Sequence, residues 1–348
     1  MSTSSTSGTP RPATIHDVAE LAGVAASTVS RALSMPDRVN FRTRERIERA
    51  AAQLHYVPSK QARSLTSGRT GAVALLVPDI TNPFYFDIVR GAQWQLKAAG
   101  YTQLLVDTEE SEEVESATLA QLRKSADGVV LAASRLTDTQ LAETARSIPL
   151  VTLNRPVSGV STVIIDTPAA TSQALDHLVS LGHRTIAYVA GPDSSWSNAR
   201  RWETLDKATE TLGTEIIRIG PFAPTQHSGA AATDSVLASG ATACIVFNDL
   251  IAIGMLRRIR ERGLTIPGDL SIVGCDDIFG ADFCHPPLTT VTAPVERAGR
   301  TAITMLLSQI EPQHASPPRS QSLLPTYLTI RASTGPAPVA AASQSIPA

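Results

Sequence analysis

The residues with the most distinctive chemistry lie between positions 26 and 31, where small polar side chains stand beside one long arginine. The predicted outer face of a short helix here contains Ala26, Ser27, Ser30 and Arg31, while Val29 points to its apolar side. An arginine can bind a guanine edge through two hydrogen bonds, and short neighbours let a helix approach bases in the major groove. The pattern indicates a base-reading helix, although an ordinary surface helical hairpin has the same appearance.

Two other predicted helices would hold this segment in place. The first covers residues 15–22, where apolar side chains repeat at helical spacing after a capping-box-like pair, Thr14 and Asp17. Gly23 can then take the positive φ of a helix C-terminal cap. The third helix is predicted over residues 41–55 and carries several arginines on its outer face. Together these elements predict a helix-turn-helix. We expect its phosphate contacts to come mainly from Ser30, Arg42, Thr43 and Arg44.

From residue 71 the pattern changes to short apolar runs separated by amphipathic segments. Four runs occupy residues 72–78, 102–107, 128–133 and 149–154, and four more occupy 184–191, 214–220, 243–249 and 270–276. Such runs are typical of parallel strands that are covered on both faces. Two successive strand–helix series predict two doubly wound α/β lobes.

Polar side chains end or directly follow many of these predicted strands. They are Asp79, Ser134, Asn154, Asn248, Asp249, Asp276 and Asp277. Ligands of open parallel sheets bind outside the carboxyl ends of the strands, and with two lobes this place is the cleft between them. Asp and Asn also favour turns and helix caps, and Asp249 is expected to cap a helix over residues 250–262. So many polar groups at one edge nevertheless predict a polyhydroxy ligand.

The helical segment also resembles a known protein family. The matching runs are DVAELAGV, STVSRAL, TRERIERAAAQLHYVPS and ARSL, and the similarity continues to about residue 333. This sequence is similar to the lactose-repressor (LacI/GalR) family of bacterial transcription regulators. The family usually has Ser or Thr at the start of the second helix. Ala25 stands there in this chain, so we expect a weaker helix cap.

The resemblance implies a homodimer that binds a pseudo-palindromic operator in double-stranded DNA. Each recognition helix would lie in a major groove, with Ala26, Ser27 and Arg31 at the base edges. Residues 58–70 would form a hinge helix on the operator, where Leu65 would act as a minor-groove wedge and Ala62 would let paired helices approach closely. A helix this short is marginal in water, so without DNA the segment is expected to be a linker.

The resemblance also implies a periplasmic sugar-binding-protein-like core that binds a small effector. The implied effector-binding residues are Tyr85, Phe86, Ser134, Asn154, Ser195, Trp196, Ser197, Arg201, Phe222, Asn248 and Asp276. Arg201 would offer a rigid fork of donors, and Asp276 would accept from hydroxyl groups. Simple core packing is the alternative for Trp196 and Phe222, and a surface salt bridge is the alternative for Arg201.

Charge and cysteine content agree with this interpretation. Residues 1–69 contain ten Lys/Arg and five Asp/Glu, whereas the remainder contains 20 and 27, so a basic headpiece precedes an acidic body. The three cysteines form no disulfide framework or paired metal motif, which fits a reducing cytosol. Because the N-terminal residues are polar, we expect a cytoplasmic protein that neither is secreted nor contacts a membrane.

Two other classes of protein could share the α/β body. A sugar-processing enzyme is disfavoured because the chain has no GxGxxG, GxxxxGK[ST], HExxH or GxSxG motif, and His177 and His183 lack metal-ligand spacing. A transport-type sugar-binding protein would need a signal peptide and would have no headpiece. We therefore expect no catalytic residues, no metal and no cofactor.

The sequence predicts the following organisation. Residues 1–13 form a disordered tail, 14–57 the headpiece, 58–70 the hinge, 71–334 the core and 335–348 a flexible tail. Within the core, the N-lobe comprises about 71–166 and 292–322, and the C-lobe about 167–291 and 323–334. The chain would cross between lobes near residues 166, 291 and 322, with a last strand over 323–334. The predicted function is a DNA-binding transcriptional regulator, a repressor controlled by a sugar- or nucleoside-like effector.

Overall fold

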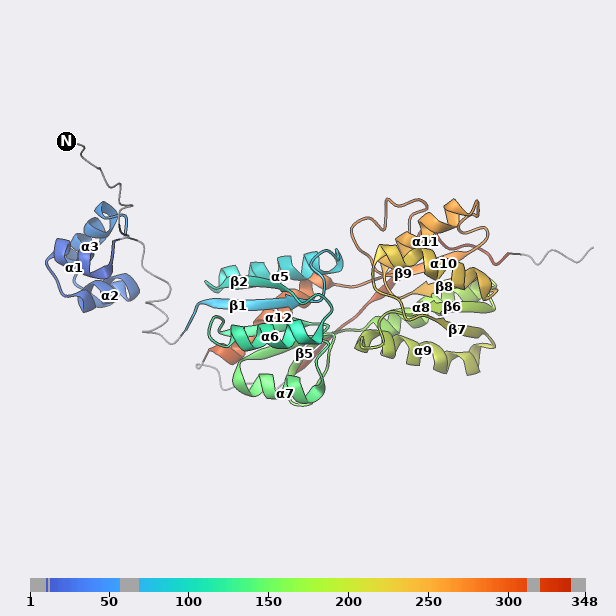
Figure 1. Ribbon diagram of the computed structural model, residues 1–348, viewed down its shortest axis with the longest axis horizontal. Helices are drawn as coiled ribbons and strands as arrows, with labels where there is room; N and C mark the ends of the chain where they lie inside the picture. Colours follow the sequence, from blue (N-terminus) through green and yellow to red (C-terminus); the bar gives the residue numbers. More distant parts are fainter. Residues whose placement is uncertain (1–10, 12, 57–68, 312–319, 339–348) are drawn as a thin grey trace, which may run out of the picture. The chain divides into compact units, whose positions relative to one another are not determined.

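The computed structural model describes residues 11, 13–56, 69–311 and 320–338 (Figure 1). The chain divides into two compact units, and the boundary in the sequence lies between Gly71 and Ala72. The first unit contains the helices α1 (Ile15–Ala22), α2 (Ala26–Ser34) and α3 (Phe41–Gln53), with a short 3-10 helix η1 (Pro36–Arg38). Within the described residues, no helix is both long enough and apolar enough to cross a membrane.

The headpiece helices begin and end where the local sequence dictates. Thr14 and Asp17 form a complete capping box at the start of α1, and Gly23 ends the helix at φ 63° and ψ 43°. The Asn40 side chain caps α3 by accepting from the backbone N–H of Arg42 at 3.0 Å. The three helices enclose a small core of Val18, Ala19, Ala22, Val29, Ala32, Ile47 and Ala50.

The start of α2 lacks such a cap, as the sequence predicts. Ala25 has the extended backbone of an N-cap residue, at φ −72° and ψ 148°, but its side chain makes no capping hydrogen bond. We therefore expect Ala25→Ser to stabilise the headpiece by about 1 kcal/mol, because a serine hydroxyl can accept from an exposed N–H of the first turn. Slower hydrogen exchange of the α2 amides would measure this gain.

Ala52→Ser is a matched control, because it adds the same hydroxyl to an exposed position inside α3. This variant should not slow exchange, since a helix interior offers no uncapped N–H. Equal exchange of α2 in the Ala25→Ser variant and the parent would contradict the capping argument.

The second unit consists of two lobes, each built on a six-stranded sheet (Figure 1). The N-lobe sheet has the order β11-β5-β4-β3-β1-β2, and the C-lobe sheet has the order β12-β10-β9-β8-β6-β7. The N-lobe strands are β1 (Ala72–Val77), β2 (Thr102–Asp107), β3 (Gly128–Ala132), β4 (Leu150–Leu153), β5 (Ser161–Ile165) and β11 (Gln321–Leu324). The C-lobe strands are β6 (Thr185–Val189), β7 (Glu215–Ile219), β8 (Ala243–Val246), β9 (Ser271–Asp276), β10 (Thr289–Thr292) and β12 (Tyr327–Thr329). The pairing of β10 with β12 is antiparallel, whereas the other pairings between the described strands are parallel. The predicted doubly wound α/β lobes are confirmed.

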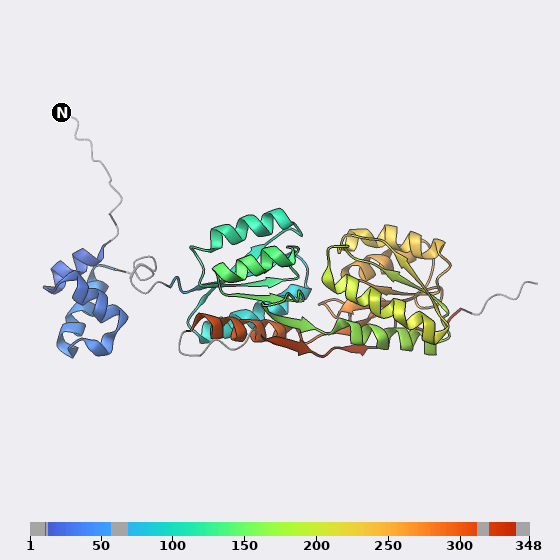
Figure 2. The ribbon, with the colours of Figure 1, turned by 90° about the horizontal axis from the view of Figure 1, so that it is seen from below.

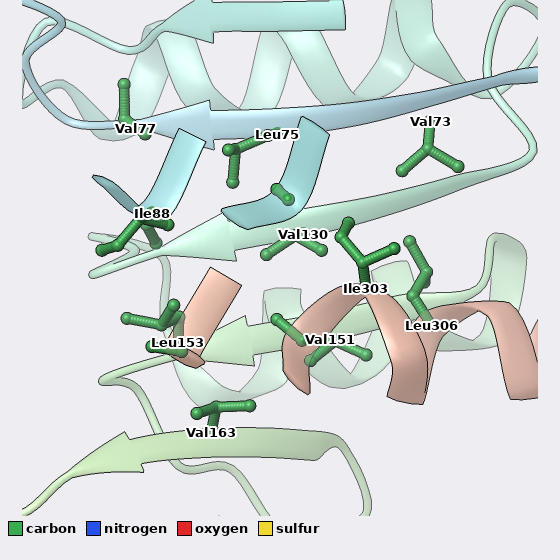
Figure 3. Close-up of a cluster of buried hydrophobic side chains, with 14 of the residues drawn as sticks. Val73, Leu75, Val77, Ile88, Val130, Val151, Leu153, Val163, Ile303 and Leu306 are labelled. Atoms are coloured by element: carbon green, nitrogen blue, oxygen red, sulfur yellow. The ribbon is translucent and has the colours of Figure 1, made fainter. Parts of the chain in front are cut away.

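Helices cover both faces of each sheet. The N-lobe helices are α5 (Phe84–Ala98) and α12 (Val295–Ile310) on one face and α6 (Glu112–Leu122) and α7 (Asp138–Ser147) on the other. The C-lobe has α8 (Thr167–Ser180) and α9 (Trp196–Leu212) on one face of its sheet. On the other face are α10 (Gly229–Ala238) and α11 (Asp249–Glu261), and the short 3-10 helix η2 (Gln226–Ser228) packs on α11. Figure 3 shows how Val130, Val151 and Ile303 fill the layer between the N-lobe sheet and its helices. Burial on both sides explains why the strands read as continuous apolar runs.

Helices α5 and α12 cross at very short range. A Cβ atom added to Gly91 would lie 2.1 Å from the carbonyl oxygen of Glu296, and one added to Gly299 would lie 2.2 Å from that of Ile88. Only glycine allows the two backbones to approach this closely. The contact fixes α5, whose first turn reaches the cleft, against α12, which begins just after a crossover between the lobes.

The chain crosses between the lobes at residue 166, at residues 293–294 and at residues 325–326, where strands of one sheet give way to elements of the other lobe. Figure 2 shows the last of these segments, in red, running from one lobe to the other. The single last strand expected over 323–334 is wrong. Pro325 lacks an N–H group, so β11 ends in the N-lobe sheet and β12 starts afresh in the C-lobe sheet. Thr326 donates to the carbonyl of Asp166 at 2.5 Å and joins two crossovers.

The flexible tail expected from residue 335 is also wrong in its first residues. The N–H of Gly335 donates to Ser271 Oγ at 3.1 Å, and its carbonyl accepts from Nε2 of buried His183 at 3.0 Å. The N–H of Ala337 donates to the carbonyl of Leu181 at 2.9 Å. His183 therefore attaches the segment around Gly335 to the C-lobe sheet.

Candidate functional site

The outer face of α2 presents Ser27 and Arg31, which are both exposed, and Ser30, which is half-buried. Ala26 differs from the expectation that it points outward, because it is half-buried against the headpiece core. It lies three residues before Val29, and this helical spacing turns its methyl group towards the same side. The open face of α2 is therefore formed mainly by Ser27 and Arg31.

The first turn of α3 holds the residues expected to contact phosphates. Arg42 is exposed, whereas Thr43 and Arg44 are half-buried. Arg44 donates through Nε to Glu48 at 2.6 Å, one helical turn away, and both side chains remain substantially exposed. Such a surface pair contributes little to stability, so Arg44 can exchange its partner for a phosphate at small cost.

Ala62 and Leu65, the residues expected in the minor groove, lie outside the described residues. Their roles remain predictions.

The core unit contains a cavity between its lobes, at the carboxyl ends of strands from both sheets. The residues expected to bind an effector that line this cavity are Tyr85, Asn154, Ser195, Ser197, Arg201, Asn248 and Asp276. The other lining residues are Asn82, Phe84, Glu110, Ala133, Arg135, Leu153, Thr167, Pro224 and Phe247. The cavity has a volume of about 50 Å³, whereas ligand pockets usually have about 300–1,000 Å³. The cavity is therefore smaller than a usual ligand pocket.

Four of the expected residues do not line the cavity. Ser134 donates instead to the carboxylate of Glu115, and its oxygen accepts from the N–H of Leu136 at 3.1 Å. Phe86 is 49% exposed on α5. Trp196 is half-buried at the start of α9, and Phe222 is half-buried against the C-lobe core.

Arg201 is the most enclosed cation of the cavity. It projects from the second turn of α9 and is 5% exposed. Its Nε donates to Thr167 Oγ1 at 3.1 Å and its Nη1 to the carbonyl of Phe247, whose ring lies 5.1 Å from the guanidinium carbon. These contacts hold the planar fork in one orientation, which is what directional binding of hydroxyl groups needs.

Two carboxyl groups act on this guanidinium. Asp276 lines the cavity at the end of β9, and burial raises its pKa well above the usual value, with Asp249 adding to the rise and Arg201 opposing it. Asp249 is fully buried at the first position of α11. It is not the helix cap that the sequence predicts. Asn248 caps α11 by accepting from the N–H of Ile251 at 3.0 Å, since it precedes the first helical residue.

Burial raises the pKa of Asp249 from 3.8 to about 6, although Thr290 and the N–H of Ile278 donate to its carboxylate at 2.6 and 3.0 Å. Because the folded pKa lies above the unfolded one, the group favours folding at low pH. This contribution is lost as the pH rises from about 4 to about 6, and it corresponds to about 3 kcal/mol.

Between pH 4 and pH 7 the parent should lose about 3 kcal/mol of unfolding free energy through Asp249, and we expect Asp249→Asn to lack this loss. Urea titration of both proteins at the two pH values measures the difference. Asparagine can keep both contacts, because its oxygen accepts from Ile278 and the Thr290 hydroxyl can turn to accept from its amide. Asp282→Asn, on an exposed loop, should retain the parent's pH dependence. The same dependence in Asp249→Asn would rule the assignment out.

Several cavity residues have an unusual backbone. Non-glycine residues with positive φ lie at or just after the ends of four strands: Glu110 (56°), Ala133 (48°), Asn154 (56°) and Asp276 (119°). All four line the cavity. Strained conformations of this kind persist where the surrounding structure holds them, and they cluster at ligand-binding sites.

The N-lobe wall contains residues that sequence reasoning missed. Tyr85 packs edge-to-face on Phe84, with ring centroids 5.1 Å apart, and Asn82 accepts from the N–H of Phe84 at 3.0 Å. Arg135 and Glu110 form an ion pair on the same wall. The available signal was their position within a few residues of the ends of predicted strands, and nearness to a strand end also identified Asn154.

Two family models match the chain. Residues 14–59 match the model described as "Bacterial regulatory proteins, lacI family", and residues 175–334 match the "Periplasmic binding protein-like domain". Among the similar proteins is the transcriptional repressor CytR of Escherichia coli (strain K12). It is 34% identical over 332 residues, which cover 92% of this chain and 96% of that protein. The transcriptional regulator CelR of Thermobifida fusca is also 34% identical, over 93% of this chain and 98% of that protein.

Solved structures give the same result. A lac repressor dimer bound to operator and the anti-inducer ONPF has a TM-score of 0.81 and 28% identity, covering 93% of this chain and 100% of that one. A complex of CelR with cellobiose has a TM-score of 0.68 and 32% identity, covering 92% and 99%. These relatives are regulators and not enzymes. The helix-turn-helix, the two-lobed core and these matches together place the chain in the LacI family of bacterial transcription regulators.

Proposed function

We propose that the chain represses transcription and that a small sugar- or nucleoside-like effector between its lobes controls its affinity for operator DNA. The observation that carries this proposal is the cavity, in which rigidly held donors and acceptors from both lobes surround a space too small for a ligand. Ligand entry would have to change the angle between the lobes. A ligand that binds one angle better shifts the protein towards it.

The proposed effector site consists of the seven expected residues that line the cavity. Ser134, Phe86, Trp196 and Phe222 are left out because their side chains lie elsewhere. Related proteins support a sugar, since CelR has been seen with cellobiose and a LacI family regulator of Enterococcus faecium with ribose. The edge-to-face pair Phe84 and Tyr85 and the ring of Phe247 give apolar faces on which a sugar or a base could lie.

The proposed DNA-binding part comprises the headpiece (14–57) and the hinge (58–70). The core (71–334) follows it in the chain and would bind the effector. Arg31 and Ser27 would read bases, with Ala26 at the margin of the contact. Ser30, Arg42, Thr43 and Arg44 would hold phosphates, and Ala62 and Leu65 would enter the minor groove. The exposure of Ser27, Arg31 and Arg42 supports this division.

The working unit would be a homodimer. Large aromatic side chains are exposed on both lobes of the core: Phe279 (81%) and Phe283 (66%), which pack edge-to-face at 5.1 Å, and Trp94 (57%), which lies against Arg300. Exposed apolar clusters of this kind mark interaction sites. The related lac repressor binds its operator as a dimer, and a second copy of this chain is the partner that we propose here.

Selection of duplexes from a random DNA pool by the purified full chain tests this function. We expect enriched sites with two inverted half-sites, because a two-fold dimer presents two recognition helices. A thermal-shift screen of sugars and nucleosides should then find a ligand that stabilises the protein and changes its affinity for the selected site. Enrichment of no sequence, or a stabilising ligand without any effect on DNA binding, would contradict the proposal.

A further inference from the structure

The charged side chains of the cavity form two balanced groups. Its lining contains two cations, Arg135 and Arg201, and two acidic residues, Glu110 and Asp276. Arg135 forms an ion pair with Glu110, and Arg201 lines the same cavity as Asp276. This balance matters because a charge buried in a closed site needs an opposite charge beside it.

On the N-lobe wall, Arg135 is committed to Glu110. Its Nε donates to Glu110 Oε2 at 2.8 Å, and its Nη2 donates to the same oxygen. The Arg135 side chain is 8% exposed, and that of Glu110 is 30% exposed. The pair is therefore largely removed from water, and a second anion could reach the guanidinium only by displacing Glu110 or sharing its donors.

On the C-lobe wall, Arg201 lines the cavity together with Asp276, which lies at the end of β9. Asp276 and the fully buried Asp249 both act on its charge. Burial raises the pKa of each acid. A second anion bound beside Arg201 would therefore also lie close to the Asp276 carboxyl group.

We infer that the cleft selects an uncharged polyhydroxy ligand and rejects its phosphorylated form, and that the Glu110–Arg135 ion pair sets this choice on the N-lobe wall. This inference rests on the proposed effector function. A phosphate monoester brings nearly two negative charges, and burying them requires opposite charge beside them. In the cleft Arg135 is already paired with Glu110, and Arg201 shares the cavity with Asp276, so a phosphate would find no guanidinium group without an acidic residue nearby.

The test uses matched pairs of ligands with the full chain. Isothermal titration compares D-ribose with ribose 5-phosphate, D-glucose with glucose 6-phosphate, and cytidine and adenosine with their 5′-monophosphates. We expect the member that binds to be uncharged and its phosphate to bind at least about tenfold more weakly. A phosphate that binds as tightly as its uncharged partner, or more tightly, would overturn the inference and leave the effector function intact. Binding of neither form in any pair would count against the effector function itself.

Variants of the ion pair test its role. Glu110→Gln removes the carboxylate from Arg135, so the preference for the uncharged ligand should fall by about tenfold. Glu109→Gln makes the same change one residue earlier, on an exposed side chain that does not line the cavity, and should keep the parent's preference.

The double variant Glu110→Gln/Arg135→Gln returns the wall to neutral and should restore much of the preference, which a role of Glu110 in contact alone would not do. Circular dichroism confirms that each variant is folded. If a folded Glu110→Gln protein discriminates as strongly as the parent, the ion pair does not set the choice. If a variant does not fold, the matched pairs on the parent chain still decide the inference about ligand charge.

Discussion

Arg201→Ala is expected to abolish the response to effector while operator binding without effector persists. The change removes the donors to Thr167 and to the carbonyl of Phe247, and it leaves Asp276 and Asp249 without their cation. Each hydrogen bond from the guanidinium to a ligand hydroxyl contributes about 1.5–3 kcal/mol, so the loss of two of them should lower effector affinity by more than about 100-fold. Titration calorimetry with the ligand found by the thermal screen measures this loss.

Arg200→Ala is the matched control for this variant. Arg200 neighbours Arg201 on α9, but its side chain is half-exposed and pairs with Glu203 on the surface. Its removal should leave effector affinity within about twofold of the parent, because exposed ion pairs contribute little. Arg201→Lys should remain weak, since an ammonium group keeps the charge but not the planar fork. A normal response in Arg201→Ala would move the effector site elsewhere.

Arg31→Ala is expected to weaken operator binding by about 1–3 kcal/mol and to relax the preference at one position in each half-site. Arg31 is exposed on the same face of α2 as Ser27, and a guanidinium that binds a guanine edge distinguishes that base pair from the others. Binding to a set of operators with single substitutions, measured by fluorescence anisotropy, would reveal the position that no longer matters.

Arg42→Ala provides the contrast. Arg42 is an exposed residue in the first turn of α3, where we expect a phosphate contact. Its loss should weaken specific and non-specific DNA binding alike and lower the slope of log K against log salt by about 1 for each headpiece. A loss confined to one operator sequence would show that Arg42 reads a base, and a uniform loss in Arg31→Ala would show that Arg31 does not.

The headpiece and the sheets could be predicted from sequence because local rules decide them. The capping box of Thr14 and Asp17, the left-handed Gly23 and the uncapped Ala25 all occur as expected. The eight apolar runs became strands because both sheets are covered on both faces. The strands β5 and β10 were not among them, and their Ser and Thr residues interrupt the apolar pattern.

The cleft was harder to predict because its residues are selected by contacts distant in sequence. Ser134 has the right type and position at a strand end, but Glu115, nineteen residues away, takes its hydroxyl. The next residue, Arg135, reaches the cavity instead and pairs with Glu110. Whether a polar residue after a strand faces a ligand or caps its own loop depends on such partners, and one sequence does not reveal them.

The ends of the core show the same limit. Pro325 breaks an apolar segment that otherwise reads as one strand, and the two halves join different sheets. Gly335 looks like the start of a polar tail, yet it bonds to His183 and Ser271 of the C-lobe. In both places contacts with distant strands decide the structure. Local sequence alone would favour one continuous strand at Pro325 and a free tail at Gly335.

The central claim is that one conformational equilibrium links the cleft to the operator, and such a link is reciprocal. The direct test is to measure effector affinity by titration calorimetry with and without saturating operator duplex. The account predicts that the two dissociation constants differ, and by the same factor by which saturating effector changes operator affinity, a factor of about 5–150 in typical allosteric proteins. Equal effector affinities in the presence and absence of operator would contradict it.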